Sequence, residues 1–237
     1  MSGTGFVTAR PLVSSSPKLA VAPGLALIFD LDGVIVDSMP VHELAWREYL
    51  ESLGMDAHDI PSRMHGRRND EIVRDFLGQE VDQQTVLAHG AAKERLFREI
   101  MRERLQQNLV PGIADWLKRV SGAPIALATN AERANIDFTL DGTGLNGYFE
   151  VIVDGSQVEH PKPAPDVYLR AAELLGVPPR NCVVFEDSPV GVAAARAADM
   201  RVVGVLTHSG PLGGVQLSVP NFLDPVLDSW LSAQRTG

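Results

Sequence analysis

The chain has 237 residues but only one cysteine, Cys182, and only four lysines. A single cysteine excludes a disulfide framework or a thiolate metal cluster within the chain. No apolar run reaches the roughly 20 residues of a membrane-spanning helix. The first residues lack the charged start, the apolar stretch and the small-residue cleavage site of a signal peptide. These absences predict a cytoplasmic protein without a membrane partner.

Positive charge is scarce as well. The sequence has 21 Lys and Arg against 30 Asp and Glu, which gives a formal net charge of −9. Nucleic acids and anionic membranes bind to basic surfaces, so neither is an expected partner. No G-x-x-x-x-G-K-[ST] loop or G-x-G-x-x-G turn follows an apolar run, which argues against a nucleotide-binding protein. An anionic substrate would have to be captured by a local group of residues.

The most informative stretch that is present covers residues 25–38, LALIFDLDGVIVDS. Its apolar run ends abruptly in Asp30 and Asp32, with Gly33 behind them. This pattern is typical of a buried strand that delivers two carboxylates to the C-terminal edge of a parallel sheet. Two buried like charges are unfavourable unless a cation or a shared proton compensates them. We therefore interpret the two acids as functional and not as solvated loop residues.

From Pro111 onward, helices and strands alternate along the chain. We expect strands over 125–129, 149–153, 182–185 and 201–206, and helices over 113–120, 131–140, 165–175, 189–198 and 224–234. This alternation predicts an α/β fold, with a parallel sheet and helices on both of its faces. The strand at 25–29 has no partner nearby in the sequence and most simply joins the same sheet.

The stretch before Pro111 has a different pattern of expected elements. Helices are expected over 40–53, 69–77 and 82–107, so residues 40–109 are predicted to form an inserted all-α domain, with 24–39 and 110–237 as the core. Residues 1–23, with three prolines and three consecutive serines, are expected to be a tail that can be partly disordered. Charged residues in the longest helix are expected to form a solvated face with local ion pairs: Lys93, Glu94, Arg95, Arg98, Glu99, Arg102, Glu103 and Arg104.

Polar side chains follow the expected strands at the points where they end. In an open parallel sheet this edge binds ligands. The residues are Asp30, Asp32, Thr129, Asn130, Asp154, Glu186, Asp187 and Ser188, and Lys162 lies in the nearby proline-rich loop 160–165. Carboxylate oxygens without neighbouring His or Cys suit Mg²⁺. Asp30, Thr129, Asn130 and Lys162 could supply a nucleophile and donors for phosphoryl transfer, which leaves Asp32 for proton transfer.

Four segments carry a resemblance to a known family. Taken in order, Phe29-Asp-Leu-Asp-Gly33, Thr129-Asn130, Lys162-Pro-Ala-Pro-Asp166 and Glu186-Asp-Ser188 resemble the motifs of the haloacid dehalogenase superfamily. The similar branch includes phosphoglycolate phosphatases, small sugar phosphatases and β-phosphoglucomutase. The resemblance implies a Rossmann-like core with an inserted helical cap at residues 40–109. Pro161 departs from the pattern, because the position before the motif lysine is usually Gly or Ser.

The resemblance also implies roles for the residues of these motifs. Asp30 would be the nucleophile that forms an aspartyl-phosphate, and Asp32 the general acid and base. Thr129 and Lys162 would hold the phosphoryl group. Mg²⁺ would be bound by Asp30, by the main-chain carbonyl of Asp32 and by Asp187, with Glu186 as a direct or water-linked ligand. An aspartate at position 30 is typical of the phosphotransferase members and disfavours dehalogenation.

The expected cap carries the candidates for substrate recognition. His42 and Trp46 lie one turn apart on its first helix and occur at matching positions in β-phosphoglucomutase, although both could equally serve packing. Arg67 and Arg68 follow Gly66 in a loop and could clamp a second anionic group of a substrate.

The same comparison separates a hydrolase from a mutase. The arginine that the mutase uses falls on Asn69 here, and its lysine after the second motif is replaced by Glu132 or Arg133. These differences favour a Mg²⁺-dependent phosphomonoester hydrolase that acts on a small, sugar-like phosphorylated metabolite. A phosphosugar mutase is the alternative, because Arg67 or Arg68 could replace the displaced arginine. A non-catalytic phosphometabolite-binding protein is a remote alternative, and a monomer or a dimer is expected.

Overall fold

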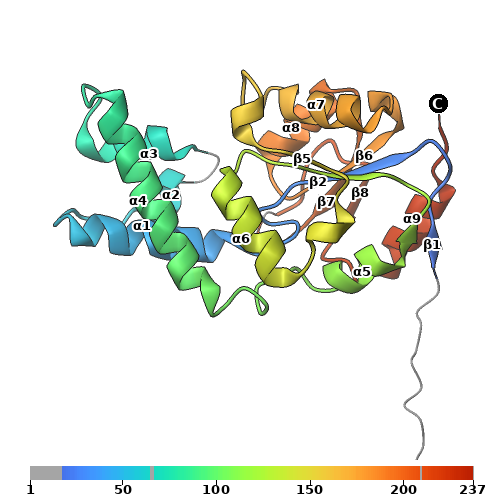
Figure 1. The fold of residues 1–237 in the computed structure, drawn as a ribbon, viewed down its shortest axis with the longest axis horizontal. Coiled ribbons are helices and arrows are strands. Elements are labelled where there is room, and N and C mark those ends of the chain that lie inside the picture. The colour runs from blue at the N-terminus through green and yellow to red at the C-terminus, as the bar shows by residue number, and fades with distance from the viewer. Residues whose placement is uncertain (1–17, 65–66, 209, 237) are drawn as a thin grey trace, which may run out of the picture.

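The computed structural model describes residues 18–64, 67–208 and 210–236. Its centre is a parallel sheet with the strand order β5-β4-β2-β6-β7-β8 (Figure 1). The strands are β2 Ala26–Phe29, β4 Ile125–Ala128, β5 Val151–Val153, β6 Cys182–Glu186, β7 Arg201–Val205 and β8 Leu217–Val219. The short strand β8 was not anticipated from the sequence. Strand β2 comes early in the chain but lies inside the sheet, so the residue after it, Asp30, lies at the middle of the carboxyl edge.

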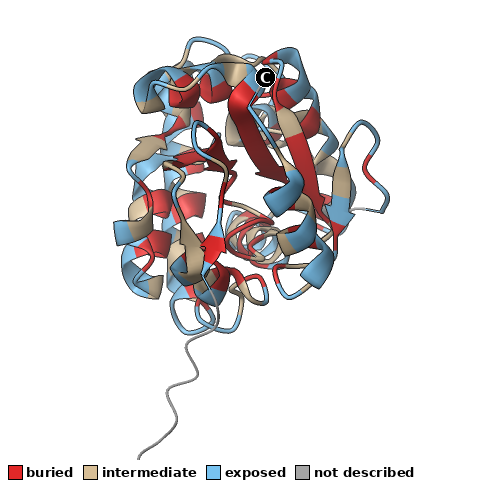
Figure 2. Ribbon diagram, turned by 90° about the vertical axis from the view of Figure 1, so that its right-hand side faces the viewer, coloured by how far each residue is buried: buried red, intermediate tan, exposed pale blue. Residues whose placement is uncertain are grey.

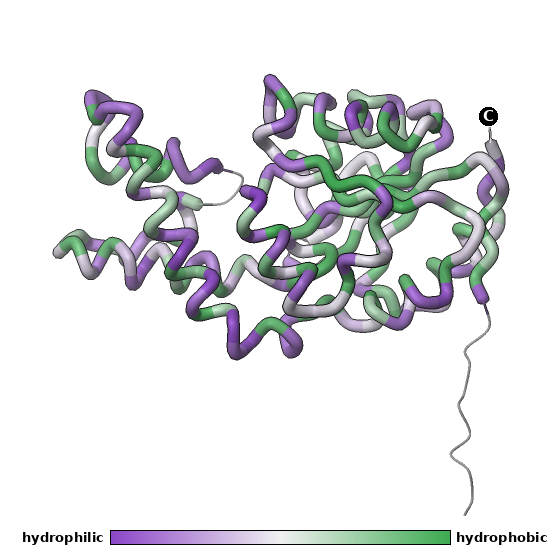
Figure 3. The backbone as a smooth tube through the Cα atoms, viewed as in Figure 1, coloured by the Kyte–Doolittle hydropathy of each residue, from purple (hydrophilic) through white to green (hydrophobic). Residues whose placement is uncertain are grey.

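Strands β2 and β6 are apolar at consecutive positions because both of their faces are covered. Every residue of the two strands is buried (Figure 2). They pair in parallel with Phe29 opposite Phe185, and the two rings stack with their centroids 4.4 Å apart. The hydropathy colours of Figure 3 show the same concentration of apolar residues along the sheet.

Helices cover both faces of the sheet, as predicted. The helices of this part are α5 Ile113–Arg119, α6 Arg133–Thr143, α7 Asp166–Leu175, α8 Pro189–Ala197 and α9 Pro225–Ala233. Helices α5, α6 and α9 contribute to the buried cluster around Leu27 and Phe29, whereas α7 and α8 contribute to the cluster around Ala26 and Ile28. Alternate residues of β2 therefore point to opposite layers. Short 3₁₀ turns occur at η1 Asn146–Tyr148, η2 Gly155–Gln157 and η3 Pro179–Asn181.

The stretch between β2 and α5 forms a helical lobe beside the sheet (Figure 1). Its helices are α1 Met39–Ser52, α2 Ile60–Met64, α3 Asn69–Leu77 and α4 Gln83–Arg102. Helices α1 and α3 both pack on α4, and Trp46, Leu50, Ile72 and Val86 belong to a separate buried cluster of this lobe. Helix α4 also contacts α6 of the core.

Two neighbouring segments connect the lobe to the core. The segment after β2 and the segment before α5 run side by side, since Asp37 N donates to Asn108 O and Val110 N donates to Ile35 O. The Asn108 side chain also donates to Asp37 O at 3.1 Å. The stretch that carries Asp30 and Asp32 therefore continues directly into the connection to the lobe.

Part of the predicted tail belongs to the core. Leu19–Ala20 form strand β1, which pairs in parallel with strand β3, Val120–Ser121. Leu19 and Val21 are buried, because these alternating apolar residues pack into the same cluster as α5. Within the tail predicted over 1–23, Leu19–Val21 thus pack on the core, while residues 1–17 lie outside the described residues. No helix in the described ranges is both long enough and apolar enough to cross a membrane.

Candidate active site

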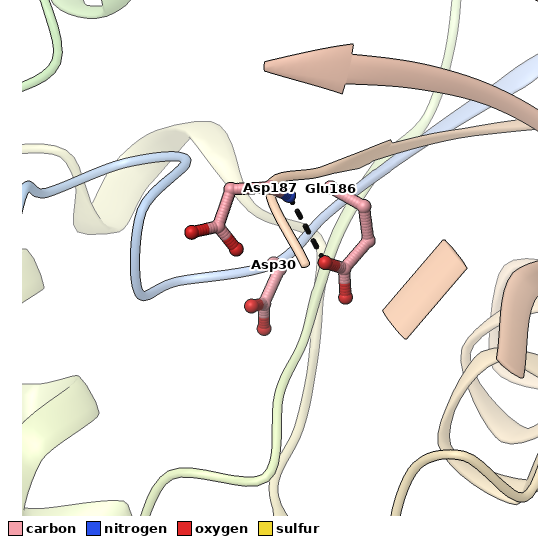
Figure 4. A group of neighbouring side chains, drawn as sticks. All are labelled: Asp30, Glu186 and Asp187. Atoms are coloured by element: carbon pink, nitrogen blue, oxygen red, sulfur yellow. Dashed lines mark hydrogen bonds between the residues drawn. The ribbon is translucent and has the colours of Figure 1, made fainter. Parts of the chain in front are cut away.

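Three carboxyl groups from two neighbouring strands meet at the carboxyl edge of the sheet. Asp30 directly follows β2, and its backbone N–H donates to Phe185 O on β6 at 3.1 Å. Glu186 is the last residue of β6, and Asp187 follows it. Oxygen atoms of Asp30, Glu186 and Asp187 lie within 4.8 Å of one another, and all three residues are buried (Figure 4). The strand pairing that sets the register of β2 and β6 therefore also assembles this cluster.

Lys162 places an ammonium group between two of these carboxylates. Its Nζ lies 2.9 Å from Oδ1 of Asp30 and 2.8 Å from Oε1 of Glu186. The backbone N–H of Lys162 donates to Oδ1 of Asn130 at 3.2 Å, which ties the lysine loop to the end of β4. Among the described residues, Oδ1 of Asp30 has no donor with hydrogen-bond geometry, so the contact with Lys162 is an ion pair.

One lysine does not balance the charge of the cluster. Burial raises the pKa of Asp30, Lys162 opposes it, and the net effect is a pKa of about 7. Burial and the charges of Glu186 and Asp30 raise the pKa of Asp187 to about 9. Burial lowers the pKa of Lys162, but Asp30 and Glu186 outweigh it and raise this pKa. The cluster therefore favours the uptake of positive charge, either as a proton or as a cation.

Glu186 differs from its two neighbours because both of its oxygens are already engaged. Oε1 accepts from Lys162 Nζ at 2.8 Å and from the Tyr168 hydroxyl at 2.6 Å. Oε2 accepts from Asp187 N at 3.0 Å, Ser188 N at 3.2 Å and Ser188 Oγ at 3.1 Å. A carboxylate has about four lone-pair sites, so these donors saturate it. Glu186 therefore holds the Lys162 side chain and the turn after β6 in position.

Two glycines leave space for these acids. Gly33 has φ +74°, and a Cβ atom on it would lie 1.9 Å from Oδ2 of Asp187. A Cβ atom on Gly191 would lie 1.6 Å from Oε1 of Glu186. The glycine of the D-x-D-G sequence therefore serves both the turn and the close approach of Asp187.

Thr129 and Asn130 lie at the end of β4, on the same edge. Thr129 is buried, and its Oγ1 accepts from the backbone N–H of Ala131 at 3.1 Å, which leaves the hydroxyl proton to be donated. Asn130 holds the lysine loop through its Oδ1. The oxygen donors of Asp30 and Asp187 are hard ligands of the kind that Mg²⁺ prefers. These two acids fit such an ion because burial and the neighbouring acids raise their pKa values, so a cation would relieve their charge.

Asp32 has a different environment from Asp30. Its Oδ1 accepts from Ser38 Oγ at 2.5 Å and lies 3.7 Å from Nε2 of His42, which projects from α1 of the lobe. Burial raises the pKa of Asp32, but His42 and Ser38 outweigh this effect and lower it. The two aspartates of the motif thus have pKa values that are shifted in opposite directions, which is the usual sign of different tasks.

Comparisons with known proteins agree with this geometry. Residues 25–199 match the family model of the haloacid dehalogenase-like hydrolases. Fructose-1-phosphate phosphatase YqaB of Escherichia coli (strain K12) is 38% identical over 183 residues, which cover 76% of this chain and 95% of that protein. Protein CbbY of Rhodobacter capsulatus is 37% identical over 216 residues, which cover 86% and 94%. The crystal structure of β-phosphoglucomutase from Clostridium difficile superposes with a TM-score of 0.73 at 26% identity and covers 87% of this chain and 96% of that one.

The chain belongs to the haloacid dehalogenase-like hydrolase family. This confirms the family that the four motifs predict, together with the Rossmann-like parallel sheet. The hydrolase is accordingly an enzyme, with phosphatases and phosphomutases among its relatives.

The lobe of the hydrolase contains a polar contact that the sequence did not predict. Lys93 and Glu94, expected on a solvated face, are only 2% and 4% exposed. They are buried because α4 packs against α1 on one side and contacts α6 on another. Lys93 Nζ lies 2.8 Å from both His42 Nδ1 and Glu94 Oε1. A signal was available, because their three- and four-residue spacing to Phe97 places both residues on the buried face of α4.

The other candidates in the lobe make their contacts within the lobe. Trp46 is 1% exposed inside the buried cluster of the lobe, which favours its packing interpretation. The Arg67 guanidinium pairs with Asp75 and donates to Glu71 O. Arg68 is more exposed, with its Nε 3.2 Å from Oδ1 of Asp70. Of the two arginines, Arg68 is thus the less constrained.

Tyr168 at the sheet edge was also missed. It lies on α7, six residues after Lys162, with its ring 4.6 Å from the Lys162 ammonium. The apolar pattern of α7 indicates a buried face at this position, but a phenol and a phenyl ring give the same pattern. Only the fold shows that its hydroxyl reaches Glu186.

Proposed function

We propose that this hydrolase is a Mg²⁺-dependent phosphomonoesterase that acts on a small sugar-like phosphate through an aspartyl-phosphate. The observation that carries the proposal is the buried Asp30 carboxyl group, which lies against a single ammonium within a cluster of acids. A carboxylate in this position can attack phosphorus, while the neighbouring cations offset the charge of the phosphate.

In the proposed first step, an oxygen of Asp30 forms a bond to phosphorus while the bond from phosphorus to the leaving oxygen breaks. Asp32, which has to take up a proton first because its pKa is lowered in the free protein, acts as general acid and gives that proton to the oxygen, so the alcohol leaves neutral. Thr129, Asn130 and Lys162 donate to the phosphoryl oxygens. In the second step, Asp32 takes a proton from water, whose oxygen attacks phosphorus and releases phosphate and the Asp30 carboxylate.

Asp30 and Asp187, with the main-chain carbonyl of Asp32, are the residues we propose to hold Mg²⁺. The ion, when bound, supplies positive charge that lets an anionic phosphate approach the acids. The saturated oxygens of Glu186 favour a supporting role, in which it orients Lys162 and reaches the ion through water.

We further propose that residues 40–109 are the cap and that residues 24–39 and 110–237 are the core. Cap closure would exclude water and choose the leaving group. Arg68 is the better candidate for contact with a second anionic group, since Arg67 is held by Asp75. The named substrate of the relative YqaB makes fructose 1-phosphate the first compound to test.

A phosphosugar mutase remains the second candidate. It is supported by the proximity of His42 to Asp32 and by the structural likeness to a β-phosphoglucomutase. Against it, the N-cap of α6 is Glu132, which accepts from Arg98 at 2.6 Å, and the next residue, Arg133, pairs with Asp137 at 2.7 Å.

The deciding experiment measures phosphate release from a panel of phosphometabolites with Mg²⁺, both with and without a sugar bisphosphate. A hydrolase releases phosphate without the bisphosphate. A mutase interconverts glucose 1-phosphate and glucose 6-phosphate faster than it releases phosphate, and the bisphosphate stimulates it. Tight binding of a panel member without turnover would support the binding-protein alternative and contradict the proposal.

A further inference from the structure

Glu94 of α4 joins three helices through its two oxygens. Oε1 accepts from Lys93 Nζ at 2.8 Å and from Asn69 Nδ2 of α3 at 2.6 Å. Oε2 accepts from Asn135 Nδ2 of α6 at 2.7 Å. The first two donors belong to the lobe and the third belongs to the core. A single carboxylate is therefore bound by both parts of the molecule.

Both polar groups of the Asn135 side chain are hydrogen-bonded. Its amide group donates to Glu94, while its Oδ1 accepts from Arg98 Nη1 at 2.5 Å. Arg98 lies one turn after Glu94 on α4 and also donates to Glu132. The orientation of the Asn135 side chain is thus determined by its two partners, with its donors toward Glu94.

Lys93 connects Glu94 to the active site through its contact with His42. An ammonium group can only donate, so His42 Nδ1, 2.8 Å from Nζ, has to accept. The proton of a neutral imidazole then lies on Nε2, which faces Oδ1 of Asp32 at 3.7 Å. The His42 ring is held in this plane by stacking on Phe97, with ring centroids 3.8 Å apart.

We propose that Glu94 is a positioning residue for Asp32: it holds the Lys93 ammonium against His42, and Asn135 makes this arrangement depend on contact between lobe and core. The inference rests on the proposed function, because it assigns Asp32 to proton transfer. Rotation of the lobe away from α6 would separate Glu94 from Asn135, so the orientation of His42 is coupled to the position of the lobe.

The burial of the Lys93–Glu94 ion pair argues against a purely structural link between lobe and core. Burial lowers the pKa of Lys93, and Glu94 is the strongest influence that opposes this. Burial raises the pKa of Glu94, but Lys93 and His42 outweigh it and lower the pKa to about 2. A buried ion pair adds little stability over apolar residues of the same shape. The exposed Arg98–Glu132 pair already links the same two helices, so packing alone does not require Glu94.

The test compares two isosteric changes at the same junction. Glu94→Gln removes the counter-charge of Lys93, whereas Glu132→Gln removes only the outer ion pair with Arg98. Long-range ¹H–¹⁵N spectra of the full chain at one pH report which His42 nitrogen carries the proton. We expect the proton on Nε2 in the wild type and in Glu132→Gln, and on Nδ1 in a large share of Glu94→Gln. The same spectrum for all three proteins would overturn the proposal.

Turnover supplies a second readout. A sugar phosphate needs a proton on its leaving oxygen, but p-nitrophenyl phosphate needs far less help because its leaving group is weakly basic. We expect Glu94→Gln to lower kcat for the sugar phosphate about tenfold or more and kcat for p-nitrophenyl phosphate by only about twofold. Equal losses with both substrates would mean a structural role and would overturn the proposal.

Asn135→Ala keeps the inference testable if Glu94→Gln does not fold. This variant leaves the charges of Lys93 and Glu94 in place and removes the hydrogen bonds of Asn135 with Glu94 and Arg98, so we expect smaller changes in the same direction. No change in the His42 spectrum would contradict the coupling to α6. If the wild type turns over no phosphate ester, the proposed function fails, while the spectra still test the role of Glu94.

Discussion

The carboxyl edge of the sheet and the junction between α4 and α6 are both buried groups of charged residues, but their charges are balanced differently. At the edge, the three acids Asp30, Glu186 and Asp187 have one ammonium among them, and the pKa values of Asp30 and Asp187 are raised to about 7 and about 9. At the junction, Glu94 has one ammonium and two amide donors, and its pKa is lowered to about 2.

This difference separates reactive charge from structural charge. At the edge, the raised pKa values of Asp30 and Asp187 favour the uptake of a proton or a cation. The junction is complete in itself, so its charges can fix geometry but have no capacity left for a ligand. Two buried clusters in one chain thus differ in how far their negative charge is compensated.

The largest expected effect follows from Asp30→Asn. If the edge carries the chemistry, this change should lower kcat by about 10⁴-fold or more, since the nucleophile is lost. It should not lower the stability of the metal-free protein at neutral pH, because the raised pKa of Asp30 means that burial of its charge outweighs the ion pair with Lys162. Phosphate release and thermal unfolding check both statements. Asp137→Asn, an exposed change on α6, is the control and should retain full activity.

Lys162→Met should cause the largest loss of stability. It leaves Asp30 and Glu186 without their shared cation, and breaking such a buried pair costs about 3–5 kcal/mol. Denaturant unfolding of the metal-free protein measures the loss. Lys118→Met removes a lysine whose pair with Asp115 is exposed, and this control should lie within about 0.5 kcal/mol of the wild type. Similar values for the two variants would contradict the proposed charge balance.

The pH dependence of stability should also distinguish the two regions. Asp30 and Asp187 have raised pKa values in the folded state, so the folded protein binds protons that the unfolded chain releases near pH 4. Without metal, stability should fall as the pH rises from about 4 through 7 to 9. Mg²⁺ should reverse the trend, with a stabilisation that grows with pH. Melting curves in EDTA and in Mg²⁺ measure this, and Asp187→Asn should flatten the metal-free curve.

A smaller effect is expected from the removal of single hydroxyl groups. Tyr168→Phe deletes the donor to the fully buried Glu186 and should lower the free energy of unfolding by about 1–2 kcal/mol. Tyr49→Phe in the lobe deletes a part-buried contact with His89 and should lower it by about 0.5 kcal/mol. A larger loss of unfolding free energy for Tyr49→Phe than for Tyr168→Phe would contradict this expectation.

The two regions also differ in how far the sequence predicts them. The acids of the edge follow apolar strands, and parallel pairing necessarily brings strand ends together, so Asp30, Glu186, Asp187 and Lys162 could be grouped from the sequence. The junction was missed because Lys93 and Glu94 stand in a run of similar charged residues, although their spacing to Phe97 is that of the buried face of α4. Their burial is decided by the packing of α4 against α1 and α6.

Short elements were missed for a related reason. Strands β1 and β8 have two and three residues, too few for an apolar period to be recognised. Their pairing is determined by neighbours distant in the sequence, as for Leu19 with Val120. The fully buried strands β2 and β6, in contrast, can be recognised from their own continuous apolar runs.

The central claim, that Asp30 is the phosphoryl acceptor, is tested most directly by trapping the acceptor itself. Excess enzyme is mixed with Mg²⁺ and a ³²P-labelled substrate from the panel and quenched in acid within milliseconds. The labelled peptide is then mapped by mass spectrometry. We predict a label on the peptide that contains Asp30, which decays as free phosphate appears and is absent from Asp30→Asn. A label on another residue, or undiminished turnover by Asp30→Asn, would contradict the account.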